Sequence, residues 1–192
     1  LGDVYKRQDL AAEMDCDLVE VTAHMGARPS HALWQGKVYS ISGKSKKYPK
    51  LSTATGYGTG DGLKGWNCRH DFYPFFEGIS ERANLPVDVT ENNRQYELSQ
   101  KQRAMERSIR ATKRRLAAYD GAISETEDEV LKRRLQNQFE RHSAILKTKE
   151  KRLSEFCDTN DLYSEKDRVR VVGFNKSVSQ KAVYGCLLYT SD

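Results

Sequence analysis

Residues 98–119, LSQKQRAMERSIRATKRRLAAY, decide the fold of the helical part of this chain. Their apolar side chains recur at steps of seven, four, seven and three, at Leu98, Met105, Ile109, Leu116 and Tyr119. An α-helix returns to the same face every three or four residues, so these side chains share one stripe. The stretch therefore predicts an amphipathic helix, and Thr90 is placed to cap its start.

A second apolar stripe follows downstream, at Leu131, Leu135, His142, Leu146, Leu153 and Phe156. Asp120-Gly121 predicts the break between the two helices. Ser124 with Glu127 fits a capping box at the start of the second helix. Two amphipathic helices joined this closely are expected to form an antiparallel hairpin. Because such a hairpin buries only narrow stripes, we expect it to need a partner surface.

Composition separates this helical part from its neighbours. Residues 9–90 contain all the proline and both tryptophans, whereas residues 91–157 contain no proline and a single glycine. We therefore expect a compact module at 9–90, a basic helical hairpin at 91–157 and a C-terminal extension at 158–185.

The compact module combines short strands with a glycine-rich loop. Residues 17–22, 37–42 and 69–76 have the pattern of strands, and Pro29 suits the start of a short helix. Residues 52–65 hold five glycines and predict a loop. The expected fold class is α+β: a small mixed module with a glycine-rich loop, followed by a long antiparallel α-helical hairpin. We expect its core to be aromatic, formed by Trp34, Trp66, Phe72, Tyr73, Phe75 and Phe76.

Charge and cysteine content exclude several protein classes. No uncharged apolar run approaches the length of a membrane span, so no membrane partner is expected. Four scattered cysteines are too few for a disulfide framework. The formal net charge is +5, and residues 91–157 carry the whole excess with 16 basic and 11 acidic side chains. The helical part is therefore the candidate for contact with an acidic partner.

Histidine and cysteine gather in two short segments flanked by glycine, as His24, His31, Cys68 and His70. Imidazole nitrogen and thiolate sulfur are the ligands that zinc prefers, and four of them would complete a tetrahedron. The spacing, however, is not a standard one, because the sequence contains no Cys-x-x-Cys pair. The sequence therefore leaves open a zinc site at these four residues or no cofactor at all.

The same residues permit two other interpretations. In a thiol enzyme, Cys68 would be the nucleophile, and its base would be His31 or His24. In the structural interpretation, which we favour, polar side chains satisfy the backbone of the glycine-rich loop, with Arg28, His31, Asn67 and Arg69 as partners. The structural interpretation predicts no catalytic residue in this chain.

Basic side chains crowd the first helix, at Arg103, Arg107, Arg110, Lys113, Arg114 and Arg115. Contacts with several phosphates would give salt-sensitive binding of nucleic acid, as in an accessory DNA-binding protein. No aromatic residues interleave for base stacking, and an acidic protein surface would suit the same charges. A solvated face, with Glu106 and Arg110 as an i,i+4 pair, is the remaining interpretation.

Several motifs in the compact module resemble those of the phage minor capsid protein 2 family. They are HMGARPSH (24–31), WQGKV (34–38), YP (48–49), TGYG (55–58), GL (62–63), GWNCRH (65–70) and YPF (73–75). Tyr96, QR (102–103), ER (106–107), IR (109–110) and Lys113 are similar to the family's charged helical part. The resemblance extends over essentially all of residues 9–185.

The resemblance implies a structural minor protein of a tailed-phage or prophage head that acts near the portal in head assembly. The implied partners are the portal protein, the major capsid protein and packaged DNA; the implied location is the virion, assembled in the bacterial host cytoplasm. A phage-carried Cys/His enzyme or metal-dependent effector module is the alternative. No catalytic residue is implied, so the motif residues are signature positions: Gly26, Arg28, Pro29, Ser30, Trp34, Gln35, Gly36, Gly56, Gly58, Gly65, Asn67 and Arg69.

The two ends of the chain resemble the translated strands of a transposon-derived sequencing adapter. The matching stretches are LGDVYKRQ (1–8) and CLLYTSD (186–192). We therefore expect both ends to be non-native and residues 9–185 to be an internal fragment of a longer protein.

Overall fold

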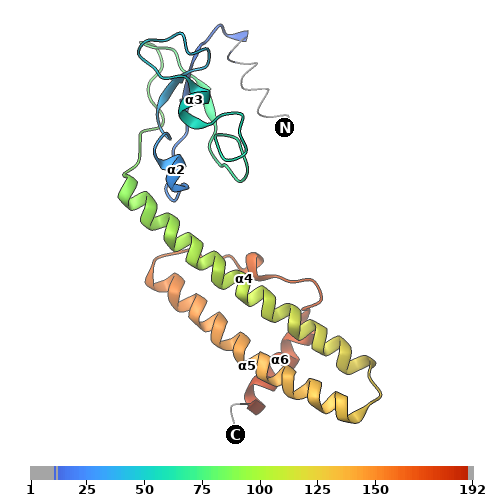
Figure 1. Ribbon diagram of the computed structural model, residues 1–192. Coiled ribbons are helices and arrows are strands. Elements are labelled where there is room, and N and C mark those ends of the chain that lie inside the picture. The colour runs from blue at the N-terminus through green and yellow to red at the C-terminus, as the bar shows by residue number, and fades with distance from the viewer. Residues whose placement is uncertain (1–10, 12, 190–192) are drawn as a thin grey trace. The chain divides into compact units, whose positions relative to one another are not determined.

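A computed structural model describes residue 11 and residues 13–189 (Figure 1). In chain order the elements are β1 (Leu18–Val21), α2 (Pro29–Ala32), β2 (Val38–Ser40), α3 (Leu51–Thr55), β3 (Phe72–Pro74), α4 (Val89–Glu125), α5 (Glu129–Thr159), the 3-10 helix η1 (Lys166–Val169) and α6 (Lys176–Tyr189). The chain divides into two compact units, one that ends at Glu97 and one that begins at Leu98. The α+β class predicted from the sequence is confirmed.

A three-stranded antiparallel sheet forms the centre of the first unit, with the strands in the order β2-β1-β3. All three predicted strands exist but are shorter than predicted. The third differs most, because pairing with β1 begins only at Phe72, opposite Val21. Residues 68–71 therefore precede the strand, and their side chains do not follow its alternation between the two faces of the sheet.

The core of this unit lies on the sheet and is only partly the predicted aromatic cluster. Trp34, Phe72 and Phe75 are buried, as predicted. Trp66 is 77% exposed and Tyr73 is 44% exposed, so the prediction was wrong for both. Trp66 belongs to the loop before β3 and its ring lies over Gly60, whereas Tyr73 points away from the core because side chains alternate along β3. Aliphatic residues complete the core instead: Val19, Val21, Leu51 and Leu63.

Glu20 on β1 is buried although the alternating pattern places it on the solvent side of the sheet. Its carboxylate accepts hydrogen bonds from the backbone N–H groups of Ala83 (3.2 Å) and Asn84 (3.1 Å), and it pairs with Arg82 at 3.4 Å. The segment that follows the sheet is thus folded back onto β1. A buried carboxylate needs such partners, because an unpaired charge in the interior is costly.

Helices α4 and α5 form the predicted antiparallel hairpin in the second unit (Figure 1). Lys149 donates to Thr112 at 2.9 Å, and the rings of Tyr119 and His142 lie 5.3 Å apart. Residue numbers rise along α4 as they fall along α5, so the helices run in opposite directions. The buried residues of the unit are Ile109, Leu116, Phe139, Leu146, Leu153, Cys157, Val178 and Ala182.

The partner surface that the hairpin needs comes from the same chain. Val178 and Ala182 of α6 belong to the core of the hairpin, and Lys181 of α6 forms an ion pair with Asp120 at 2.6 Å. Cys186 is buried on this helix although it was assigned to the non-native end. The predicted adapter-derived stretches otherwise fall largely on residues 1–8 and 190–192, which lie outside the described residues.

The predicted helix ends were wrong, and in both helices an aspartate is the actual cap. Helix α4 begins one residue before Thr90, where the Asp88 carboxylate accepts from the Glu91 N–H at 2.7 Å. It also continues through Asp120-Gly121, because a glycine inside a helix costs only about 1 kcal/mol. Helix α5 begins after Asp128, whose carboxylate accepts from the N–H groups two and three residues further on. Ser124 is still inside α4 and caps nothing.

Three further features complete the fold. All four cysteines are free thiols. Among the described residues, no helix combines the length and the apolar character needed to cross a bilayer. Leu131 is 43% exposed rather than part of the apolar stripe, because it lies in the first turn of α5.

Replacing Asp128 by alanine tests the observed start of α5. We expect Asp128→Ala to lower the free energy of unfolding of the helical unit by about 1 kcal/mol, because two backbone N–H groups lose their acceptor. Ser124→Ala is the matched control and should change it by less than about 0.5 kcal/mol. Urea unfolding followed by circular dichroism measures both; equal losses would contradict this helix start.

Replacing Glu20 by alanine tests how the segment around Ala83 is held. We expect Glu20→Ala to speed amide hydrogen exchange at Ala83 and Asn84 at least tenfold, because both N–H groups lose their acceptor. Glu13→Ala, which removes an exposed carboxylate, is the control and should leave both rates unchanged. Hydrogen-exchange mass spectrometry reports the rates, and an unchanged rate in Glu20→Ala would show that the carboxylate does not hold the segment.

Candidate functional site

The structure brings three of the four predicted ligands together in the first unit. His31, Cys68 and His70 each offer one ligand atom, and these atoms all lie within 4.8 Å of one another. We call these three residues the His/Cys cluster. His24 is not part of that set, but its ring stacks on His70 with a centroid separation of 4.4 Å.

The pairing of β1 with β3 explains why segments so far apart in sequence converge. The C-terminal end of β1 lies beside the start of β3, and pairing continues past the strands: the Thr22 N–H donates to Asp71 at 2.8 Å and the Thr22 hydroxyl accepts from Asp71 N–H at 2.8 Å. His24 follows β1 and His70 precedes β3, so both rings reach the same edge of the sheet.

Helix α2 adds the third ring. The helix begins at Pro29, whose fixed φ suits a first helical position. His31 is 3% exposed, and its ring lies 4.6 Å from that of Trp34, which in turn lies 4.8 Å from that of His70. The rings of His31, Trp34 and His70 therefore pack as one group beside the sheet edge.

Two buried amides hold this group in place. The Asn92 side chain, at the start of α4, accepts from the Ala27 N–H and donates to the Ala27 carbonyl, both at 2.9 Å. The Gln35 amide nitrogen donates to the Asn92 amide oxygen at 3.5 Å. Its oxygen is then left to accept from the His24 N–H at 3.0 Å. Neither Gln35 nor Asn92 has exposed surface.

This network fixes the tautomers of both histidines in the cluster. The Gln35 oxygen is an acceptor, so Nε2 of His70, at 2.9 Å, carries the hydrogen and donates to it. The lone pair of His70 is then on Nδ1, which lies 3.7 Å from Cys68 Sγ. Nε2–H of His31 likewise donates to the Asp61 carbonyl at 2.9 Å. Each neutral ring thus keeps one nitrogen lone pair available.

The surroundings favour the neutral forms of these rings. Burial, together with the nearby His24 and His31, lowers the pKa of His70 to about 3. Burial likewise lowers the pKa of His31, against the opposing effect of its hydrogen bond to Asp61. Both rings are therefore uncharged near neutral pH, the state in which imidazole accepts a proton or binds a metal.

His24 has one nitrogen that no described residue satisfies. Its Nδ1–H donates to the Met25 carbonyl at 3.1 Å. Nε2 is buried and has no hydrogen-bond partner among the described residues. A buried acceptor without a partner is uncommon and calls for a water molecule, an ion or a ligand.

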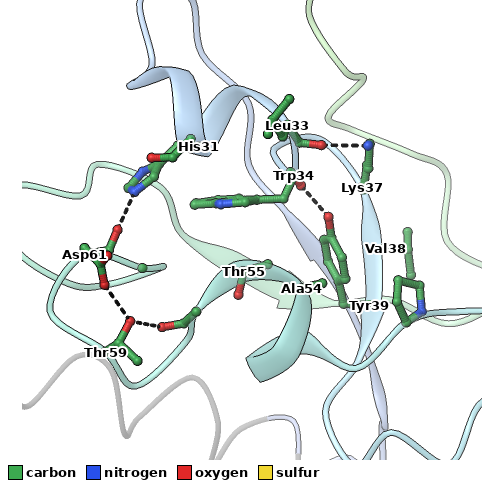
Figure 2. Close-up of a pocket in the computed structure, with 14 residues that line it drawn as sticks. His31, Leu33, Trp34, Lys37, Val38, Tyr39, Ala54, Thr55, Thr59 and Asp61 are labelled. Carbon is green, nitrogen blue, oxygen red and sulfur yellow. Dashed lines mark hydrogen bonds between the residues drawn. The ribbon is translucent and has the colours of Figure 1, made fainter.

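An open cleft of about 550 Å³ borders the cluster on the side of His31 (Figure 2). Trp34, Tyr39, Thr59 and Asp61 also line it. The Tyr39 hydroxyl donates to the Trp34 carbonyl at 2.7 Å, and burial raises the pKa of Tyr39 to about 12. Tyr39 is therefore a fixed wall of the cleft rather than an acid or base.

The geometry changes the thiol-enzyme interpretation. The ring nitrogen next to Cys68 belongs to His70, not to His31 or His24 as predicted. Because the pKa of His70 is lowered to about 3, an imidazolium that would stabilise a thiolate is unfavourable there. This arrangement suits ligation better than nucleophilic attack.

The glycine-rich loop approaches itself so closely that side chains would not fit. A Cβ at Gly62 would lie 2.0 Å from the Gly56 oxygen, and one at Gly65 would lie 2.3 Å from the Gly60 oxygen. Gly56 itself ends α3 with φ of 65°. Of the polar side chains predicted to satisfy this loop, Arg28 donates to the Trp66 carbonyl at 3.1 Å and His31 to Asp61, whereas Arg69 is exposed.

Sequence reasoning missed Asn92 altogether. It lies in the first turn of a predicted helix, where an asparagine suggests only a weak helix former. Gln35 was identified as a signature position, but its role in orienting His70 was not. Both roles depend on contacts between residues 35 or more positions apart, for which a single sequence carries no pattern.

The basic residues predicted on the first helix separate into two groups. Arg107, Arg114 and Arg115 are exposed, and Arg103 is partly exposed. Arg110 donates to the Arg168 carbonyl, and Lys113 pairs with Glu150 at 2.9 Å. Arg110 and Lys113 therefore make contacts inside the second unit. The side chains of Arg107, Arg114 and Arg115 face solvent.

Comparison with known proteins places this chain in a family. The family model described as phage minor capsid protein 2 matches residues 4–158. A "Structural protein" of Lactococcus phage LL-H is 36% identical over 102 residues, which are 51% of this chain and 28% of that protein. A "Structural protein" of Lactococcus phage mv4 is 40% identical over 72 residues, which are 38% of this chain and 58% of that protein.

The chain thus spans less than two thirds of either relative. No solved structure matches it significantly. Because the family model covers both the glycine-rich module and most of the helical hairpin, the two are parts of one family pattern. The chain belongs to the phage minor capsid protein 2 family.

Proposed function

We propose that this chain is part of a minor structural protein of a tailed-phage or prophage head, which acts beside the portal during head assembly in the host cytoplasm. Membership of the minor capsid family supports a place in the virion. Both phage relatives are named "Structural protein", which supports it as well. The single observation that carries the docking role is the exposed basic surface of α4.

We define the basic surface as Arg107, Arg114 and Arg115. All three side chains are exposed, and none forms an ion pair within the described part of the chain. Arg107 and Arg114 are seven residues apart and share one face of the helix. That face is opposite the buried Ile109 and Leu116, so packing of the hairpin leaves it accessible.

Unpaired arginines on a rigid helix suit an acidic protein surface. Arginine binds carboxylates in a two-pronged geometry, and complementary charge speeds association at low salt. The portal or the major capsid protein would provide that surface. The glycine-rich module would then be carried by the docked helices.

Reversing the basic surface tests this role. We expect the full-length protein with Arg107→Glu, Arg114→Glu and Arg115→Glu to fall at least tenfold in purified virions, because attraction to the acidic partner becomes repulsion. Quantitative mass spectrometry of particles from the phage that encodes it measures the copy number. Crosslinking from α4 in assembling heads identifies the partner, which we expect to be the portal protein.

The control makes the same change of charge elsewhere in the chain. Lys44→Glu, Lys46→Glu and Lys50→Glu alter three exposed lysines of the first unit and should leave the copy number within about twofold of wild type. Equal incorporation of both triple variants would contradict docking through α4. Absence of the wild-type protein from purified heads would reject the virion role itself.

A further inference from the structure

The His/Cys cluster has the donor types and spacing of a zinc site. Zinc binds histidine nitrogen at about 2.0–2.1 Å and cysteine sulfur at about 2.3 Å, so two such ligands on a tetrahedral ion lie about 3.6 Å apart. Cys68 Sγ and His70 Nδ1 lie 3.7 Å apart. With His31, the three ligand atoms all lie within 4.8 Å of one another, so small side-chain movements would close the set around one ion.

The second nitrogen of each ring is already held as it is in metal sites. A histidine that binds a metal almost always donates its other N–H to a carboxylate, a carbonyl or water. Here His70 donates to the Gln35 amide oxygen at 2.9 Å and His31 to the Asp61 carbonyl at 2.9 Å. Gln35 is held in turn by Asn92. The rings are thus oriented and keep a lone pair free before any ion binds.

The environment also suits a divalent cation. The Cys68 thiol is partly exposed, and His31 borders the open cleft, which gives an ion a way in. The unpaired His24 Nε2 provides an acceptor beside the cluster for a metal-bound water.

We propose that His31, Cys68 and His70 bind one zinc ion, with a water molecule at the fourth position. The ion would join α2 to the segment before β3 and so fasten the glycine-rich loop that lies between them. Binding releases one proton, from the Cys68 thiol, and involves no redox step. Zinc binding here is independent of where in the virion the chain acts.

Metal content of the wild-type chain is the first test. The full chain is purified under reducing conditions, stripped of metal with a chelator, loaded with zinc and dialysed to remove the excess. Elemental mass spectrometry should then find about one zinc ion per chain. Loading with Co²⁺ instead should produce the near-ultraviolet charge-transfer band of a thiolate–cobalt bond. A chain that retains less than about a tenth of an equivalent and shows no such band would overturn the proposal.

Matched variants identify the ligands. We expect Cys68→Ser and His70→Gln each to lower the zinc affinity at least tenfold. In the Co²⁺-loaded protein, Cys68→Ser should abolish the thiolate band and His70→Gln should alter it. Cys157→Ser and His142→Gln, which change the same residue types in the second unit, should bind zinc as wild type does. Wild-type affinity in Cys68→Ser, or equal loss in both control variants, would rule out this ligand set.

A third variant tests the group that orients His70. Gln35→Leu keeps all three ligands but removes the acceptor that orients His70, so zinc affinity should fall about 10–100-fold. Zinc should also raise the melting temperature of the wild-type chain and not that of Cys68→Ser, because only the folded state holds the site. Equal thermal shifts in the two proteins would show that zinc binds elsewhere.

Discussion

The side-chain amide of Gln35 is the contact on which the first unit depends. Its oxygen accepts from the backbone of His24 and from the ring of His70, and its nitrogen donates to Asn92. Three separate segments, after β1, before β3 and at the start of α4, are joined at this fully buried group. Because a buried amide that loses a partner costs about 1–3 kcal/mol, the network allows one arrangement of the rings and excludes others.

The helical unit follows from local patterns, and for that reason much of it could be predicted. A stripe such as Ile109 and Leu116 depends only on the period of the helix, which a single sequence displays. Helix ends were harder, because several polar residues competed to cap each helix. Asp88 and Asp128 are the caps rather than Thr90 and Ser124, because their carboxylates face the free N–H groups of the first helical turn.

The site follows from long-range contacts, so the sequence identified its residue types but not its geometry. Cys68 and His70 both precede β3, which begins only at Phe72, so no strand geometry fixes where their side chains lie. Their convergence with His31 depends on the register of β1 against β3. No spacing rule in a single chain encodes that register, and Asn92 could not have been identified without it.

The distribution of charge separates the work of the two units and favours a protein over DNA as the docking partner. On α4, the exposed cations without an ion pair in the described part of the chain are those of the basic surface and Lys101. Duplex DNA binding is stabilised by the release of counterions. Each phosphate contacted adds about 0.9 to the steepness with which the logarithm of the binding constant falls with the logarithm of salt concentration. Arg110 and Lys113 are occupied inside the unit, and the three arginines of the basic surface alone would support a slope of only about 3. That is weak for DNA, whereas a carboxylate-rich protein surface can pair each arginine at a defined place and add apolar contacts around it.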